Sequence, residues 1–196
     1  MNRTLIFIGL IIGLTACGEG TRRLHPQEVA EYIKVRDNGF FQKAEIGDFV
    51  VELMYLPPVI QALRQNEGGA NPDTDLDSLT ASFSDVINFN MRIKHISDTP
   101  FDDLVNDEQG TGLAYMVGGI AHRLLIEYGD STSNCLFHHF ERDFGMSPYG
   151  VVNMAFRRPT ATDKITFVYN DQLFNMGPVR FNIPLKQLDE SFKVIH

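Results

Sequence analysis

The sequence predicts a mainly β fold, an antiparallel β-sandwich that carries one or two short helices. Segments in which apolar and polar residues alternate recur along the chain, and a period of two is typical of half-buried strands. Most connections between these segments are short and lack the regular crossover helices of a parallel sheet. The 15 phenylalanines supply large side chains for a core between two sheets. The strand candidates are 32–35, 48–55, 86–96, 134–141, 150–157, 164–170 and 178–183.

Turn and helix signals organise the first half of the chain. The candidate 32–35 ends at Asp37–Gly39, a strong turn signal because Asn and Gly tolerate a positive φ. We therefore expect 32–35 and 48–55 to form a hairpin or to lie side by side. The two prolines at 57–58 end the second strand, and the latter proline begins a short helix that stops at the glycines 68–69.

The second half contains two helix signals and a hairpin signal. The segment 98–100, Asp-Thr-Pro, favours a helix over 100–106. Apolar residues over 113–128 fit one helical face, although the glycines 118–119 weaken a helix by about 1 kcal/mol each relative to alanine. The candidates 164–170 and 178–183 alternate in the same way, which predicts a hairpin.

Residues 1–16 have the pattern of a bacterial export signal. A basic start at Arg3 precedes an apolar run and then small residues. The apolar run is about ten residues long, whereas a membrane-spanning helix needs roughly 20, so a permanent span is disfavoured. We expect a lipidated tether over 17–26 and a single β-rich domain over 27–196, because the remaining length suits one domain.

The segment Leu14–Cys17 resembles the lipobox of bacterial prolipoproteins, in which an aliphatic residue and two small or polar residues precede an obligatory cysteine. The resemblance implies a diacylglyceryl thioether on Cys17, cleavage before it, and acylation of the new amino group with chains such as palmitate. Two or three acyl chains hold a protein on a membrane durably, whereas one binds reversibly. An ordinary secretory signal, cleaved after Ala16 and leaving Cys17 as a plain thiol, is the alternative.

The lipoprotein resemblance also implies a location. Lipoproteins kept in the inner membrane by the enteric sorting rule carry Asp after the cysteine, so Gly18 implies the outer membrane, facing either the periplasm or the exterior. The rest of the chain is similar to uncharacterised lipoproteins of gut and environmental bacteria, a resemblance that brings no activity with it. The stretches that carry it are 37–39, 55–58, 135–145 and 169–171.

The charge of the chain argues against some partners. The formal net charge is −8, and removing residues 1–16 takes away one arginine and no acid. Such an acidic chain repels phosphate backbones and anionic headgroups, so we expect no nucleic-acid partner. Attachment to the bilayer is therefore expected through the covalent lipid on Cys17, with no other cofactor.

The second cysteine is expected to be structural. With Cys17 acylated, Cys135 has no partner for a disulfide within the chain. It lies beside Leu136 and Phe137, and a free cysteine in apolar surroundings usually behaves as a small buried hydrophobe.

The densest ionisable cluster is 138–143, where His139 and Glu141 would share one face of a strand and His138 would lie on the other. A histidine and a carboxylate two residues apart can supply two zinc ligands, but a catalytic site needs three. His95 or His122 would have to come from elsewhere in the fold. The competing interpretation is a solvated strand.

Two further motifs are incomplete. Asp73, Asp75 and Asp77 are spaced like the first ligands of a calcium loop, but an EF-hand would need Gly and Glu where Ser78 and Ser84 stand. A looser calcium site and a plain acidic loop are the alternatives. The segment 129–131, Gly-Asp-Ser, resembles the nucleophile block of GDS-type lipases and esterases, yet it lies mid-chain and lacks that family's C-terminal Asp and His pair, so it also fits an ordinary turn.

No complete catalytic constellation is found in the sequence. The leading hypothesis is therefore a membrane-anchored, non-enzymatic envelope lipoprotein that binds an envelope protein or serves as an accessory or assembly subunit. Small β-sandwich lipoproteins of type VI secretion systems offer an analogy at the level of fold only. The alternative is a metal-dependent enzyme or binder that uses His138, His139 and Glu141.

Overall fold

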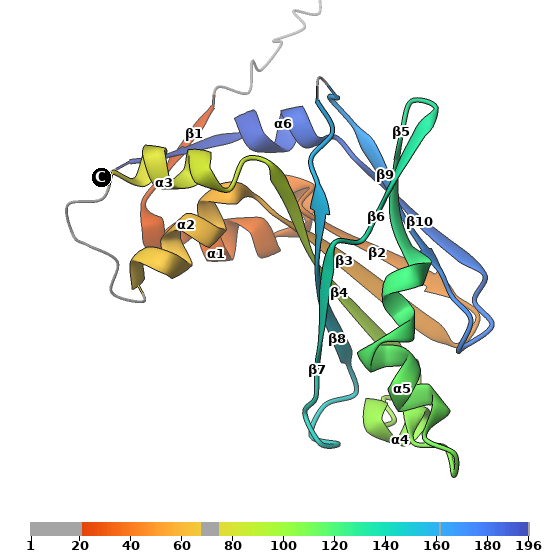
Figure 1. Cartoon of the computed structure of the whole chain (residues 1–196). Helices are drawn as coiled ribbons and strands as arrows, with labels where there is room; N and C mark the ends of the chain where they lie inside the picture. The colour runs from red at the N-terminus through yellow and green to blue at the C-terminus, as the bar shows by residue number, and fades with distance from the viewer. Residues whose placement is uncertain (1–20, 68–74, 161, 196) are drawn as a thin grey trace, which may run out of the picture.

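The computed structural model describes residues 21–67, 75–160 and 162–195 (Figure 1). It has the mainly β, antiparallel architecture that the sequence predicts, with two larger sheets, a small third sheet and short helices. The export signal and Cys17 lie outside the described residues. Within the described ranges, no helix is both long and apolar enough to cross a membrane.

One sheet has five strands in the order β2-β3-β4-β8-β7, and every neighbouring pair is antiparallel. The predicted strands 48–55, 86–96 and 150–157 are confirmed as β3, β4 and β8. The partner of β3 in the first hairpin is β2, which sequence patterns did not reveal. The bounds are β2 (Phe41–Ile46), β3 (Phe49–Leu56), β4 (Val86–His95), β7 (Phe137–Glu141) and β8 (Gly150–Arg157).

The other large sheet has four strands in the order β10-β9-β5-β6. The predicted hairpin of the last two candidates is confirmed as β9–β10. The predicted single strand 134–141 is wrong, because the chain leaves β6 in this sheet at Asn134 and enters β7 of the five-stranded sheet at Phe137. The bounds are β5 (Leu124–Tyr128), β6 (Ser131–Asn134), β9 (Ile165–Asn170) and β10 (Pro178–Ile183).

Aromatic rings fill the space between the two sheets. Phe89 of β4 and Phe156 of β8 contact Phe167 of β9, with ring centroids 5.4 and 6.1 Å apart, and all three side chains are fully buried. Each such pair contributes about 0.5–1.5 kcal/mol beyond the burial of its area. The phenylalanine-rich core expected of a sandwich is therefore present.

Six short α-helices lie within the described residues. The helices expected from Pro58 and over 100–106 are confirmed as α2 and α4. The predicted strand 32–35 is wrong, because most of it is the end of α1. Its Val29 and Ile33 are one helical turn apart and both buried, so packing selects the helix over the short alternation. The bounds are α1 (Pro26–Lys34), α2 (Pro58–Glu67), α3 (Leu76–Ser82), α4 (Phe101–Val105), α5 (Thr111–Val117) and α6 (Leu185–Glu190).

The helix predicted over 113–128 is only partly right. Helix α5 ends at Val117, a 3-10 turn follows over Gly119–Arg123, and β5 begins at Leu124. The two glycines at 118–119 stand where the helix ends, as expected from their low helix propensity.

The two ends of the described chain meet in the third sheet. Strand β1 (Arg22–Leu24) pairs in parallel with β11 (Phe192–Val194), and β1 lies beside α6 at the top of Figure 1. The predicted tether 17–26 is therefore too long, because residues 22–24 are a strand and α1 begins at Pro26. This pairing joins the N-terminal segment directly to the fold.

Candidate functional site

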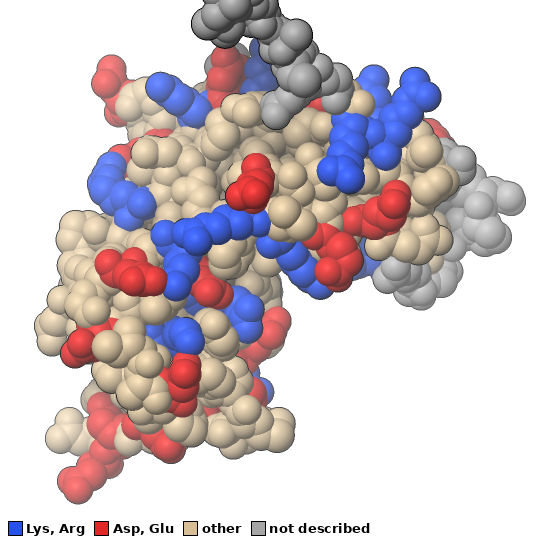
Figure 2. Space-filling view, turned by 180° about the vertical axis from the view of Figure 1, so that it is seen from behind, with Lys and Arg blue, Asp and Glu red and all other residues tan. Residues whose placement is uncertain are grey.

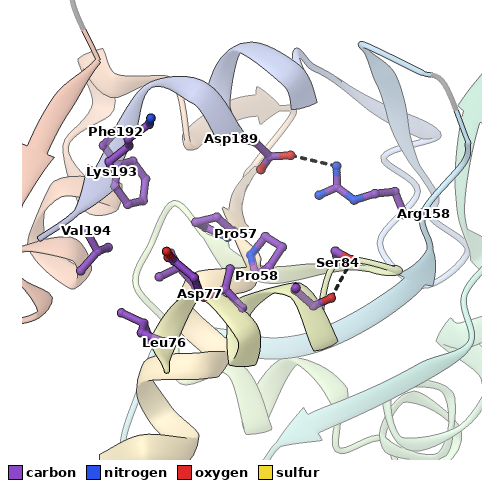
Figure 3. A pocket seen from close by; sticks show the side chains of 13 residues that line it. Pro57, Pro58, Leu76, Asp77, Ser84, Arg158, Asp189, Phe192, Lys193 and Val194 are labelled. Atoms are coloured by element: carbon purple, nitrogen blue, oxygen red, sulfur yellow. Dashed lines mark hydrogen bonds and ion pairs between the residues drawn. The ribbon is translucent and has the colours of Figure 1, made fainter. Parts of the chain in front are cut away.

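An open groove of about 500 Å³ lies between helices α2 and α3 on one side and α6 with β11 on the other (Figure 3). We call it the α3–β11 groove. Its lining mixes apolar and polar residues, and the polar ones include Arg158 and Asp189 at one end. The apolar lining residues are Pro57, Pro58, Val59, Leu76, Ala81, Phe192 and Val194.

Local sequence explains how the helical wall forms. The prolines that end β3 also start α2, because proline lacks the N–H that a first helical turn leaves unpaired. Helix α3 starts at Asp75, whose carboxylate accepts hydrogen bonds from the backbone N–H groups of Asp77 and Ser78 at 3.3 and 3.2 Å. Leu76 then follows as a buried residue of the first turn.

Three side chains form a closed polar network beside the groove. The Tyr55 hydroxyl donates to Asp189 Oδ1 at 2.6 Å, and Arg158 donates from Nη1 to Asp189 Oδ2 and from Nη2 to the Tyr55 oxygen, both at 2.8 Å. Figure 3 shows the pair Arg158 and Asp189 at the groove. The network ties β3, the end of β8 and α6 together.

The electrostatics of this network oppose catalysis by its tyrosine. Burial raises the pKa of Tyr55 far above its ordinary value, and the nearby negative charge of Asp189 raises it further. The hydroxyl therefore remains protonated at neutral pH. Because the carboxylate and the guanidinium are already paired with each other, the trio acts as a structural tie.

Two buried polar atoms of groove-lining residues have no hydrogen-bond partner within the described part of the chain. They are Thr80 Oγ1 and Arg158 Nε. An unsatisfied buried polar atom costs about 1–3 kcal/mol, so such atoms are rare in native proteins. Because both atoms are themselves buried, they lie beside the groove and are not exposed on its open surface.

The structure does not bring the histidine candidates together with a third ligand. His138 Nε2 lies 2.8 Å from the backbone oxygen of Val117, while Glu141 accepts a hydrogen bond from Asn153, and His139 is exposed. His95 instead packs edge-on against Phe49, with ring centroids 5.2 Å apart. Among the described residues, no three His, Cys, Asp or Glu side chains are placed to hold a metal ion.

Within the described residues, the acidic motif and the Gly-Asp-Ser motif have structural roles. Asp73 lies outside the described residues, Asp75 caps α3, and Asp77 stands in the first turn of that helix. The part of this acidic segment that the structure describes is therefore the start of a helix. Gly129, at φ +52°, and Asp130 form the turn between β5 and β6, and Ser131 is the first residue of β6, in line with the turn interpretation.

Cys135 is half-buried and packs against the core where the chain passes from one sheet to the other. Burial raises the pKa of its thiol, and the Sγ–H donates to the Phe137 carbonyl oxygen at 3.0 Å. A raised pKa lowers the thiolate fraction, so this cysteine is a poor nucleophile.

Sequence reasoning missed the groove because its parts are far apart in the chain. Tyr55 and Asp189 are separated by 134 positions, and Tyr55 and Arg158 by 103. The local signals available were the two prolines after β3 and the spacing of Asp75 and Ser78, a common helix start. Neither signal indicates that α6 and β11 form the other side of the groove.

Comparisons with known proteins identify no family. No family model matches the sequence, and no curated protein matches it. A solved structure of a DUF4426 family protein from Pseudomonas aeruginosa PAO1 matches 74% of this chain and 91% of its own, with 8% sequence identity and a TM-score of 0.35. A TM-score this low does not establish a shared fold or function.

Proposed function

We propose that this chain is a membrane-anchored bacterial envelope lipoprotein whose domain binds another envelope component through the α3–β11 groove, without catalysing a reaction. The observation that carries the proposal is the groove itself, an open concavity of about 500 Å³ lined by apolar side chains together with polar ones such as Ser84 and Lys193. A concave surface that combines apolar side chains with a few polar groups is the usual form of a binding site.

The position of β1 supports a short anchor. The lipobox cysteine is Cys17 and the first strand begins at Arg22, so five Cα–Cα steps separate the acylated residue from the folded domain. At about 3.5 Å per residue these steps span at most about 18 Å. Because β1 pairs with β11, and β11 lines the groove, the groove would lie close to the membrane. The partner we expect is therefore a membrane protein or a component held near the membrane, and Gly18 favours the outer membrane.

The charged groups support binding over catalysis. Asp189 and Arg158 are paired with each other, and burial raises the pKa of Tyr55, so the Tyr55 hydroxyl does not act as a general base at neutral pH. The alternative of a metal-dependent enzyme or binder would need His138, His139 and Glu141 to converge. In the structure His138 contacts α5, while Glu141 binds its neighbour on β8.

Charge also supports a protein partner over a nucleic acid. On the face shown in Figure 2, basic and acidic side chains are interspersed, so this face presents no broad basic surface to a phosphate backbone. The net charge of −8 adds a general repulsion.

A charge placed in the groove tests the proposal. Ala81 is exposed and lines the groove, so Ala81→Arg should block binding while leaving the fold intact. Thr132→Arg, at an exposed position on β6 outside the groove, is the matched control. We expect partners cross-linked to the acylated protein in its native membranes to be recovered about tenfold less with Ala81→Arg and unchanged with Thr132→Arg. Equal recovery with both variants would overturn the role of the groove.

A further inference from the structure

We propose that the α3–β11 groove accepts an extended polypeptide, which adds to the free edge of β11 and becomes the third strand of the β1–β11 sheet. This inference rests on the proposed function, because it names the ligand class of the same groove. The occupant it commits to is a segment of a partner protein in β conformation.

The hydrogen bonds of the small sheet show which edge of β11 is paired with β1. The Arg22 N–H donates to the Ser191 carbonyl at 3.0 Å, and the Ile195 N–H donates to the Leu24 carbonyl at 2.9 Å. In an extended strand, the N–H and C=O of one residue point to the same edge, and those of the next residue point to the opposite edge. The N–H and C=O groups of Phe192 and Val194 therefore point away from β1, and within the described residues they have no hydrogen-bond partner.

The groove borders this free edge. All three residues of β11 line the groove, whereas no residue of β1 does. Since β1 occupies one edge of β11, the groove lies on the other side. Figure 3 shows Phe192, Lys193 and Val194 on one side and Leu76, Asp77 and the two prolines toward the other.

The spacing of the free groups selects the ligand. The N–H groups of Phe192 and Val194 are two residues apart, which corresponds to about 6.6 Å along a strand. The carbonyl groups on one edge of another extended chain repeat at the same distance, so an added strand can accept both bonds. The carbonyls of a helix are already engaged in its internal bonds, so a helix does not offer this pattern.

The walls add a side-chain preference. Val59 of α2 and Leu76 of α3 line the groove together with β11, so side chains on one face of an added strand would meet apolar surface. Because side chains alternate along a strand, the ligand we infer has apolar residues at every second position. The added strand continues an existing sheet, so the backbone supplies affinity and the wall supplies selectivity.

A pair of chemically modified peptides tests the backbone contact. The probe is an acetylated, amidated hexapeptide of alternating threonine and valine, added to the ¹⁵N-labelled acylated chain in detergent micelles. Two N-methylated forms, one methylated at every valine and one at every threonine, each block one edge of the peptide. We expect the parent to shift the amide signals of Phe192 and Val194, and only one of the two methylated forms to lose affinity, by about tenfold or more.

A proline variant tests the same bond from the protein side. Val194→Pro removes an N–H that points to the groove, while Val194→Ala shortens the side chain and keeps that N–H. We expect Val194→Pro to abolish peptide binding and Val194→Ala to retain it. Unchanged circular dichroism of both variants shows that the fold is kept; if Val194→Pro unfolds, the N-methylated peptides alone decide.

Several results would overturn the inference. These are no binding of the parent peptide at millimolar concentration, equal binding of both methylated forms and the parent, or shifts that map outside the groove. A dimer of this chain that Ala81→Arg dissolves would place a second copy in the groove and would also overturn it. If the peptides fail while Ala81→Arg still reduces partner recovery, the proposed function stands and only the ligand class is wrong.

Discussion

Tyr55 and Asp189 are 134 positions apart in the chain, yet the tyrosine hydroxyl donates a 2.6 Å hydrogen bond to the aspartate carboxylate. The bond joins the end of β3 to α6, and Arg158 completes the network from just beyond the end of β8. Because α6 leads directly into β11, this contact places one wall of the α3–β11 groove against the rest of the fold.

Tyr55→Phe should destabilise the protein by about 1–3 kcal/mol, because it leaves a buried donor and acceptor without their partner while keeping the ring. Urea denaturation followed by circular dichroism measures the loss. Tyr149→Phe is the control, since that ring lies under Arg92, with the guanidinium carbon 4.0 Å from its centroid, and we expect a change below about 0.5 kcal/mol. Equal effects of the two variants would contradict the structural role of the network.

Stability should fall steeply in alkaline solution. Burial is the main cause that raises the pKa of Tyr55 and of Tyr169 above the ordinary value of 10.0. Below pH 10 these residues are protonated in both states, so their full contribution is present there. Above pH 10 they ionise only when the chain unfolds, so the unfolded state is favoured by about 1.4 kcal/mol per pH unit for each of them.

Absorbance of tyrosinate near 295 nm, read beside circular dichroism, checks this pH dependence. Of the six tyrosines, we expect at least Tyr55 and Tyr169 to ionise only together with unfolding, and burial raises the pKa of Tyr115 as well. In Tyr55→Phe the slope of the unfolding free energy against pH should become smaller. Ionisation of all six near pH 10 with the fold intact would show that neither pKa is raised.

Gly150→Ala should destabilise the sandwich by about 1–3 kcal/mol through overpacking. A β-carbon at Gly150 would overlap the ring of the buried Phe101. Gly118→Ala is the control, because its β-carbon would meet a backbone oxygen at an ordinary 3.7 Å. Thermal unfolding of both variants measures the difference, and pairing Gly150→Ala with Phe101→Leu should recover part of the loss.

The proposed lipid anchor can be tested at the sulfur atom of Cys17. Cells fed labelled palmitate should incorporate label into the wild-type chain and into Cys135→Ser, because Cys135 is half-buried and lies inside the fold. Cys17→Ser should incorporate none. Label retained by Cys17→Ser would remove the basis for the anchor, and mass spectrometry of the processed chain gives the modified mass independently.

Long regular strands could be read from the sequence, for a clear physical reason. In β4 and β10, alternate side chains face the core and the solvent, and Ile87, Phe89, Met91 and Ile93 are fully buried on one face of β4. The polarity of each residue in such a strand matches the side that it faces, so the period of two can be recognised within the segment itself. The same holds for the turn at 129–131 and for the helix that begins after the prolines of β3.

Short and interrupted elements could not be read in this way. The four residues 32–35 alternate like a strand, but the packing of Val29 and Ile33 makes their segment a helix. The apolar stretch 134–141 gives no sign that Cys135 and Leu136 carry the chain from one sheet to the other. These segments contain too few residues for periodicity to distinguish a strand from a helix, or one strand from two.

The sequence by itself determined the export signal and lipobox interpretation, the β class and the positions of the longer strands, because each depends on neighbouring residues. Only the tertiary structure decided the α3–β11 groove, the network of Tyr55, Arg158 and Asp189, and the pairing of β1 with β11. Those features join segments that are distant along the chain. They arise where burial and hydrogen bonding bring such segments together, and no local pattern records which segments will meet.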